Sequence, residues 1–292
     1  KLFSNNSKIL INSAQNIPIN IKSIPLLILS KIFKTSHAYA HRSTRDRLPI
    51  IFNNINKFTL NQSSGLIVRS NCSKEYYSQR GYTKPIKIIG NGVQSNPFIN
   101  NQITISLKAK FKKQTFKIGF VGKVLEKKGI FDLVQACKYL SFDYVLIIVG
   151  NGSDLNGVIK SCNRENIKYV HYDYVSNQDI FSYLSYFDVL VLPSITTNSW
   201  VEMFGRVLIE AMSVGTPVIG SDSGGIPRTI SKCGLVYAES NVRELANCIS
   251  TLFKDKELYN SYCHKGLMNA SNYSWKNIAY KINEYMDEVQ HV

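Results

Sequence analysis

One region in the second half of the chain changes its hydrophobic period twice. Residues 189–192 form a short apolar run that ends at Pro193, which is typical of a buried strand. After a polar loop, apolar side chains recur at the spacing of one helix face, at Phe204, Val207, Leu208, Ala211 and Met212. Gly215 ends this helix, and residues 217–219 begin another apolar run. The pattern predicts a strand–loop–helix–strand unit of a parallel sheet.

The same alternation extends to both sides of this unit. We predict further strands at residues 116–121, 144–149, 167–171 and 235–238. Helices are predicted at residues 130–140, 155–164, 177–187, 242–253 and 257–270. Strands that alternate with helices are typical of βαβ units, so this part should be a complete doubly wound domain.

The first part of the chain shows a shorter series of similar elements. Strands are predicted at residues 8–12, 65–70 and 86–89, and helices at residues 24–34 and 72–80. Residues 94–117 are polar and then lysine-rich, which favours a linker, and residues 275–289 read as a last helix. The alternation of strands and helices therefore predicts the α/β fold class.

Composition restricts the class of protein. The chain has 292 residues and 44% hydrophobic residues, enough for one large or two modest cores. No run of 18 apolar residues predicts a membrane span, and the start of the chain has no signal-peptide pattern. Because it begins at Lys1, we expect a fragment. The six cysteines form no C-x-x-C motif and are expected to be reduced thiols of a cytosolic protein.

Charge is distributed unevenly along the chain. Residues 1–117 carry 19 Lys and Arg but only Asp46 and Glu75 as acids, a net charge of +17, whereas residues 118–292 carry −2. A basic half of this kind suits an anionic membrane leaflet, a phosphorylated lipid or nucleic acid. It includes a cluster that is either a solvated face or a contact for an anionic acceptor or headgroup, formed by Lys34, Arg42, Arg45 and Arg47.

His37 and His41 are four residues apart, a spacing that can hold a metal ion on a helix. No third ligand accompanies them in the sequence, and metal sites in proteins need at least three. We therefore assign no metal site.

Two carboxylates accompany the predicted helix that follows residue 200. Glu202 lies just before the helix, where backbone N–H groups are unpaired, and Glu210 lies two turns further on. A helix start at the carboxyl edge of a parallel sheet is suited to a diphosphate, and carboxylates accept hydrogen bonds from sugar hydroxyls. The alternative is that Glu202, Arg206 and Glu210 form only surface ion pairs at i, i+4 and i+8.

The surrounding residues carry a resemblance to a known family. From Pro193 to Ser221 the sequence reads P-S-x(7)-E-x-F-G-x-x-L-I-E-A-M-x-x-G-x-P-V-I-x-S. This pattern resembles the donor-sugar motif of GT-B glycosyltransferases, specifically the retaining group called family 4, with Glu202 and Glu210 at its E-x(7)-E pair. The segment G-Y-x-x-x-I-K-I-I-G-N-G-V before residue 94 also resembles the end of a GT-B amino-terminal domain.

The resemblance implies roles for the residues around the two carboxylates. Glu202 would hold hydroxyls of the transferred sugar, and Glu210 would accept from the nucleotide ribose. Backbone N–H groups would be offered to the sugar by Met203, Phe204 and Gly205. Arg206 and Val207 would lie near the diphosphate.

A second motif follows the strand predicted at residues 116–121. The stretch F-V-G-K-V-L-E-K-K-G resembles the family's G-R-x(4)-K-G, whose cations grip the donor diphosphate. Here Gly122 and Lys128 match, while Lys123 replaces the arginine and offers a point charge without a bidentate grip. Such cations would neutralise charge on the departing nucleotide. The alternative is lysines on a solvated turn.

Three glycine-containing or related turns complete the candidate site. V-G-N-G-S at residues 149–153 is a weak signal that is not G-x-G-x-x-G, so no nicotinamide site is predicted. Asp173 takes a glycine position of the family, and base contacts are expected near Tyr174. Residues 221–227 are either a glycine loop that approaches a ligand closely or a plain loop.

The resemblance implies the GT-B type of fold, with two Rossmann-like domains, of which the first is incomplete and the second is a complete doubly wound parallel sheet. Residues 1–105 would be an acceptor-side domain that lacks its opening strands and glycine-rich loop, with the helix at residues 274–292 packed back on it. Residues 106–273 would bind the donor. His37 and His41 do not match the family's catalytic context.

The predicted activity is transfer of a sugar, with retention, from a nucleotide-diphosphate sugar to a lipid, glycan or small-molecule acceptor. No metal or other cofactor is expected, because a helix dipole and lysines would take the leaving charge. We predict a cytoplasmic protein whose basic residues 1–117 face an anionic acceptor or membrane surface. The alternatives are a non-catalytic nucleotide-sugar-binding subunit that needs a partner chain and, ranked last, a nucleic-acid binder, which no aromatic-basic motif supports.

Overall fold

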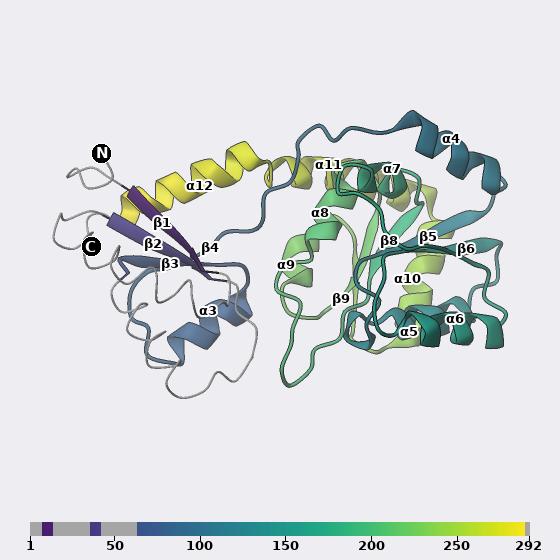
Figure 1. Ribbon diagram of the computed structural model, residues 1–292, viewed down its shortest axis with the longest axis horizontal. Coiled ribbons are helices and arrows are strands. Elements are labelled where there is room, and N and C mark those ends of the chain that lie inside the picture. Colours follow the sequence, from purple (N-terminus) through teal and green to yellow (C-terminus); the bar gives the residue numbers. More distant parts are fainter. Residues whose placement is uncertain (1–7, 14–35, 42–62, 290–292) are drawn as a thin grey trace. The chain divides into compact units, whose positions relative to one another are not determined.

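A computed structural model describes residues 8–13, 36–41 and 63–289 of the chain (Figure 1). The chain divides into two compact units. The four-stranded unit comprises residues 1–91, 198–204 and 276–292, and the six-stranded unit comprises residues 92–197 and 205–275. The predicted helix at residues 24–34 and the cluster of Lys34, Arg42, Arg45 and Arg47 lie outside the described residues.

The four-stranded unit contains a parallel sheet in the order β1-β2-β3-β4. Its strands are β1 (Lys8–Ser13), β2 (Ser36–His41), β3 (Gly65–Val68) and β4 (Ile86–Ile88). Helix α3 (Asn71–Ser78) packs on β3 and β4, and α12 (Trp275–Glu288) supplies the last helix. The elements predicted at residues 8–12, 65–70, 72–80, 86–89 and 275–289 are therefore confirmed.

Helix α12 is attached to this sheet by one buried tyrosine. The hydroxyl oxygen of Tyr285 accepts a hydrogen bond from the backbone N–H of Leu66 at 3.0 Å. The same hydroxyl donates to the carbonyl oxygen of Pro85, just before β4. Tyr285 therefore joins the two neighbouring strands β3 and β4, and Lys87 pairs with Glu288 nearby at 2.7 Å.

The six-stranded unit contains a second parallel sheet, in the order β10-β9-β8-β5-β6-β7. Its strands are β5 (Phe116–Val121), β6 (Tyr144–Val149), β7 (Tyr169–Tyr172), β8 (Val189–Leu192), β9 (Val218–Ser221) and β10 (Leu235–Tyr237). The central strands are buried along almost their whole length, as expected for a sheet covered on both faces.

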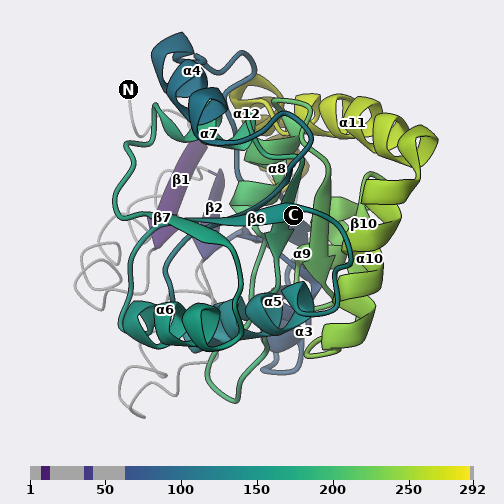
Figure 2. The ribbon, with the colours of Figure 1, turned by 90° about the vertical axis from the view of Figure 1, so that its right-hand side faces the viewer.

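Helices cover both faces of this sheet (Figures 1 and 2). One group of contacting helices contains α5 (Ile130–Cys137), α6 (Leu155–Arg164) and α10 (Val242–Lys254). The other group contains α4 (Asn101–Lys110), α7 (Ile180–Leu184), α8 (Arg206–Met212), α9 (Ile226–Ile230) and α11 (Lys256–Ser271). This is the doubly wound α/β architecture that the sequence predicts.

The structure corrects the predicted linker at residues 94–117, because that segment contains helix α4. Asn100 caps the helix by accepting from the N–H of Gln102 at 3.0 Å, and Leu107 is buried against the unit. The apolar stripe of this helix is short and its outer positions are rich in lysine, so the sequence pattern did not indicate a helix. The boundary drawn between residues 105 and 106 falls inside α4, whereas the two compact units meet between residues 91 and 92.

Three further differences concern short elements. Helix α7 begins at Ile180 rather than residue 177, because the Ser176 hydroxyl accepts from the N–H of Asp179 and holds a turn there. Helix α8 begins at Arg206, so Phe204 lies before it. Helix α9 was not predicted, since the loop at residues 221–227 leads directly into its five residues.

His37 and His41 lie on a strand, β2, and not on a helix. Four residues along a strand span about 13 Å, so the helical spacing that would bring two imidazoles together does not apply. Within the part of the chain that the structure describes, no group of three His, Cys, Asp or Glu could hold a metal ion. None of the described helices is long and apolar enough to cross a membrane.

The first and last segments of the six-stranded unit are joined to each other, although between them the chain leaves this unit for residues 198–204. Val93 forms an isolated parallel bridge with Ser274, and its N–H donates to the carbonyl oxygen of Tyr273 at 2.8 Å. A Cβ atom at Gly92 would overlap the ring of Trp275. The segments at residues 92–93 and 273–275 therefore run against each other.

Candidate functional site

The carboxyl ends of β5 and β6 lead into two loops that are bonded to each other. The N–H of Gly122 donates to the carbonyl oxygen of Val149 at 3.0 Å, and the N–H of Val124 donates to that of Asn151 at 3.0 Å. In return, the N–H of Asp154 donates to the carbonyl oxygen of Val124 at 3.3 Å. Main-chain hydrogen bonds therefore fix the residues after β5, and these bonds do not involve their side chains.

Glycines make this close packing possible at two points. Gly150 has φ 129° and a Cβ there would overlap the carbonyl oxygen of Gly122. Gly129 has φ 69°, and a Cβ there would overlap the carbonyl oxygen of Pro193, at the end of β8. Because a positive φ and a close main-chain contact coincide, only glycine fits without strain. The V-G-N-G-S motif is thus a turn, as predicted.

Both lysines of the candidate diphosphate grip lie on the loop after β5. Lys123 is exposed, directly after Gly122, and Lys128 is half-buried in the short 3-10 turn η1 (Glu126–Lys128). The turn is held by the N–H of Lys128, which donates to the carbonyl oxygen of Leu125 at 2.8 Å. We call residues 122–129 the lysine loop.

The lysine loop is attached to the loops on either side of it. The N–H of Glu126 donates to Asp154 Oδ2 at 2.7 Å, and the carbonyl oxygen of Lys127 accepts from the N–H of Ile195 at 2.9 Å. The first contact joins it to the loop after β6 and the second to the loop after β8. Three loops at the carboxyl edge of the sheet are therefore one bonded assembly, where open α/β sheets bind their ligands.

The loop after β8 is held by a carboxylate that sequence reasoning missed. Glu239, two residues after β10, accepts from the N–H of Thr196 at 2.6 Å through Oε2 and from the Thr196 hydroxyl through Oε1. That hydroxyl also lies 2.9 Å from the hydroxyl of Ser223. The N–H of Glu239 donates to Asp222 at 2.8 Å. The only sequence signal for this clamp was an acid directly after a strand.

Glu210 lies on α8, which begins after Gly205 in the left-handed conformation at φ 73°. Its Oε1 is 2.9 Å from Arg206 Nε, and the Glu210 side chain is 13% exposed against 54% for Arg206. The ion pair weighed as an alternative therefore exists for this pair. Burial raises the pKa of Glu210, and Arg206 opposes that rise. Val207 is half-buried on the same helix.

Glu202, Met203 and Phe204 belong to the four-stranded unit. Glu202 and Met203 are half-buried and Phe204 is buried. The hydroxyl of Ser73, in the first turn of α3, lies 4.0 Å from Met203 Sδ. The candidate residues thus fall into four groups, on the lysine loop, on α8 with Gly205, on the segment at residues 198–204, and at Tyr174 after β7.

Tyr174 follows β7 and is 86% exposed, beside the exposed Asp173. Another residue of this strand, His171, was not predicted to matter. Its Nε2–H donates to the carbonyl oxygen of Gly150 at 2.8 Å, and the N–H of Gly150 donates to the carbonyl oxygen of Tyr172 at 2.8 Å. The turn at Gly150 is therefore bonded to β7 through both the carbonyl oxygen and the N–H of this glycine.

Comparison with known families identifies the chain. The family described as glycosyl transferases group 1 matches residues 101–267, more than half of the sequence. The chain belongs to this family. The match includes the lysine loop, Tyr174, the segment at residues 198–204 and α8.

Several curated relatives are similar to this chain over part of their length. A capsular polysaccharide biosynthesis glycosyltransferase, CapM of Staphylococcus aureus, is 25% identical over 240 residues, which cover 76% of this chain and 59% of the relative. The 2-deoxystreptamine glucosyltransferase of Streptomyces kanamyceticus is 30% identical over 146 residues, 47% of this chain and 36% of the relative. The chain therefore spans about three fifths of the first relative and less of the second.

Solved structures share the fold of this chain. Sucrose-phosphate synthase from Thermosynechococcus elongatus superposes with a TM-score of 0.76 at 20% identity, covering 97% of this chain and 73% of the other. HepE from Anabaena, in complex with UDP and glucose, gives a TM-score of 0.76 at 21% identity, covering 96% and 78%. The predicted GT-B type of α/β fold, with parallel sheets, is confirmed.

Proposed function

We propose that this chain acts as a retaining glycosyltransferase of family 4, which moves a sugar from a nucleotide-diphosphate sugar to a lipid, glycan or small-molecule acceptor. The observation that supports it most is the lysine loop. Two lysines lie on one loop, held by main-chain hydrogen bonds, at the carboxyl edge of a parallel sheet, in a chain of the group 1 family. The E-x(7)-E pair follows downstream in the order that the family motif requires.

In this proposal the lysine loop receives the diphosphate. Lys123 and Lys128 neutralise the charge that develops as the nucleotide departs, so the step needs no metal ion or other cofactor. Gly122 lets the chain turn beside the phosphates, since its φ is 148° and no atom lies within 4 Å of a Cβ built there. Lys123 acts as a point charge, which predicts a weaker grip than the bidentate one of arginine.

The remaining roles concern the sugar and the nucleoside. Glu210 accepts from the ribose hydroxyls, for which a partly buried carboxylate beside Arg206 is suited. Glu202 holds hydroxyls of the transferred sugar, with backbone N–H groups of Met203, Phe204 and Gly205. Arg206 and Val207 lie near the diphosphate, and the backbone near Tyr174 contacts the base.

Residues 1–105 are assigned the acceptor side in this proposal, together with the last helix. Their excess of positive charge suits an anionic acceptor or a peripheral position at an anionic membrane surface in the cytoplasm. Within residues 63–91, several cations are used inside the unit: Arg69 donates to the carbonyls of Ile89 and Gly90, and Lys84 donates to that of Ser63.

Calorimetric titration with UDP and UDP-glucose tests the donor site. We choose UDP because the HepE structures contain UDP or UDP-glucose. We expect Lys128→Met to weaken UDP binding about tenfold or more, since a charged hydrogen bond contributes roughly 1.5–3 kcal/mol. Lys160→Met, the same change at an exposed position of α6, is the control and should bind as the wild type does. Equal affinity of all three proteins would refute the assignment.

The second candidate is a nucleotide-sugar-binding subunit that needs a partner chain for catalysis. The observation in its favour is that the matched motif residues all concern the donor, at residues 122–129 and 202–210, while no catalytic residue is assigned within residues 1–105. Incubation of the purified chain with labelled UDP-glucose and candidate acceptors separates the two. The subunit is favoured if the purified chain binds UDP, if Lys128→Met weakens that binding, and if no glycosylated product forms.

A further inference from the structure

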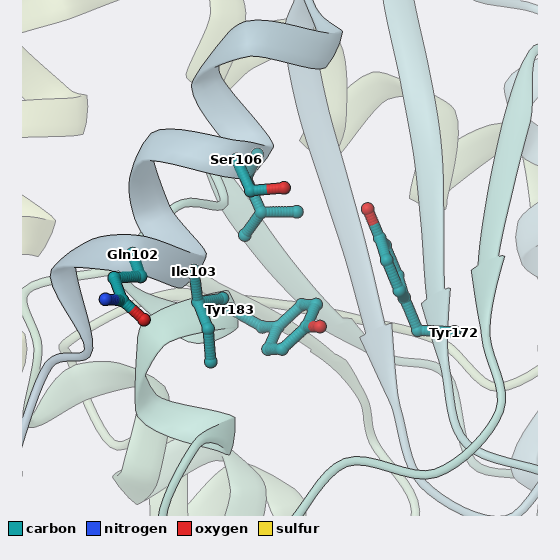
Figure 3. A pocket seen from close by; sticks show the side chains of 6 residues that line it. Gln102, Ile103, Ser106, Tyr172 and Tyr183 are labelled. Atoms are coloured by element: carbon teal, nitrogen blue, oxygen red, sulfur yellow. The ribbon is translucent and has the colours of Figure 1, made fainter.

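A cavity of about 230 Å³ lies in the six-stranded unit, and no residue of the lysine loop lines it. Figure 3 shows it between α4, the end of β7 and α7. Its walls are formed by Gln102, Ile103, Ser106, Leu107, Tyr172 and Tyr183. None of these residues was assigned a role in donor binding.

One end of the cavity is apolar and aromatic. The rings of Tyr172 and Tyr183 have centroids 5.0 Å apart and meet at 67°, so they form a corner. Ile103 and Leu107 of α4 form the wall opposite, and Leu107 is only 2% exposed. A corner of two edge-to-face rings beside aliphatic side chains favours another aromatic ring.

The other end of the cavity carries hydroxyl groups and a cation. In Figure 3 the Ser106 hydroxyl points toward Tyr172, whose own hydroxyl lies at the same end. Lys110, one turn further along α4, donates to the Tyr172 hydroxyl at 3.1 Å and lies 4.9 Å from the centre of that ring. An ammonium group and two hydroxyls therefore converge at this end.

The charges around the cavity differ between its two ends. No lining residue is acidic, and residues 76–117 contain no Asp or Glu. Asp179 acts on the opposite, Tyr183 end: the pKa of Tyr183 is raised by burial, then by Tyr172 and Asp179. Asp179 itself accepts from the Ser176 hydroxyl at 2.8 Å. An anionic group would thus be favoured beside Lys110 and disfavoured at the aromatic corner.

We propose that this cavity is a binding site for a small monocyclic aromatic anion, with its ring in the corner of Tyr172 and Tyr183 and its carboxylate or phosphate beside Lys110, Ser106 and the Tyr172 hydroxyl. The volume agrees with this class, because it exceeds the about 150 Å³ of an enclosed cavity that takes up benzene, and the open side beside the exposed Ser106 leaves an anionic group in contact with solvent. The site is separate from the proposed donor site, although the carbonyl oxygen of Tyr172 accepts from the N–H of Gly150.

The test uses the full chain and two anionic probes, benzoate and phenyl phosphate, followed by saturation-transfer NMR and calorimetry. Benzyl alcohol, which lacks the charge, and cyclohexanecarboxylate, which lacks the aromatic ring, are the ligand controls. We expect at least one anionic aromatic probe to bind about tenfold more tightly than either control. The preferred probe tells whether a carboxylate or a phosphate is the natural group.

Three variants locate the binding. Lys110→Met should weaken the preferred probe about tenfold, because it removes the charge and keeps the stem. Lys108→Met, the same change on the same helix outside the cavity, should leave binding unchanged. Ser106→Trp should abolish binding by filling the space, with thermal unfolding measured to show that the variant is folded.

The proposal is overturned if neither anion binds below about 10 mM, or if a control ligand binds as tightly as the anions. Equal binding by wild type and Lys110→Met, or by folded Ser106→Trp, overturns it as well. Displacement of the probe by UDP would place the cavity within the donor site and contradict a separate site. No donor is needed for the binding measurements, so failure of the proposed glycosyl transfer would not affect them.

Discussion

The loops after β5 and β8 follow neighbouring strands of one sheet but are built in different ways. The lysine loop is held mainly by main-chain hydrogen bonds and by glycines that allow close packing. The loop after β8 is held by a side chain, the carboxylate of Glu239, which takes both the N–H and the hydroxyl of Thr196. A loop fixed by its own backbone can present its side chains to a ligand. In the loop after β8, by contrast, the carboxylate is occupied by the hydrogen bonds that hold the loop.

The largest effect is expected at Gly129, where the two loops meet. Gly129→Ala introduces a Cβ that overlaps the carbonyl oxygen of Pro193 at a residue with φ 69°. We expect a loss of about 3 kcal/mol or more in the free energy of unfolding, measured by urea denaturation. Gly215→Ala is the control, because its φ is 80° but the closest atom to its Cβ is 3.7 Å away. It should cost only about 1 kcal/mol, and equal costs would show that the contact with Pro193 has no weight.

Removing the charge of Glu239 tests the other kind of loop. Glu239→Gln should lower the free energy of unfolding by about 2 kcal/mol, since it weakens two charge-assisted hydrogen bonds to Thr196. Glu257→Gln, at an exposed position of α11, should stay within about 0.5 kcal/mol of the wild type. In a double-mutant cycle with Thr196→Val, strict additivity would contradict the clamp.

The pH dependence of stability tests the burial of Glu210. Burial raises its pKa above the ordinary value of 4.5, so the folded state holds the proton more tightly than the unfolded state. The stabilisation from the protonated form is complete below that value and is lost as the pH rises through the raised pKa. The unfolding free energy of the wild type minus that of Glu210→Gln should therefore fall as the pH rises from about 4 upward. A difference that stays constant or rises would mean that Arg206 outweighs burial.

The smallest effect is expected where the lysine loop departs from the family motif. Lys123→Arg restores a planar group that can bind a diphosphate through two hydrogen bonds. We expect UDP affinity to rise about threefold, measured by calorimetry. Lys160→Arg should have no effect, and a loss of affinity in Lys123→Arg would argue that the loop is shaped for an ammonium group.

The sequence predicted most elements of the six-stranded unit because their signals are local. The apolar runs that became β6 and β8 are buried over most of their length, as such runs require. Helix α4 was missed because only Ile103 and Leu107 mark its inner side, among polar residues and lysines. Helix α9 was missed because its five residues are held by tertiary packing, with Ile226 and Ile230 against Gly220.

In the candidate site, too, local motifs were predicted from the sequence and contacts between distant residues were not. Lys123 and Lys128 are five residues apart on one turn, so a short motif was enough to place them together. The bonds between Thr196 and Glu239 join residues 43 apart, and the bond of His171 to Gly150 joins residues 21 apart. Such pairs depend on which strands become neighbours in the sheet, and no local pattern reports that.

The bridge between Val93 and Ser274 bears on how the six-stranded unit can be re-engineered. Because the first and last segments of the six-stranded unit are bonded to each other, that unit resembles a cassette whose ends emerge at one place. A short peptide between residues 275 and 92 would therefore close this unit into a circular permutant, in which residues 198–204 of the other unit become a free loop.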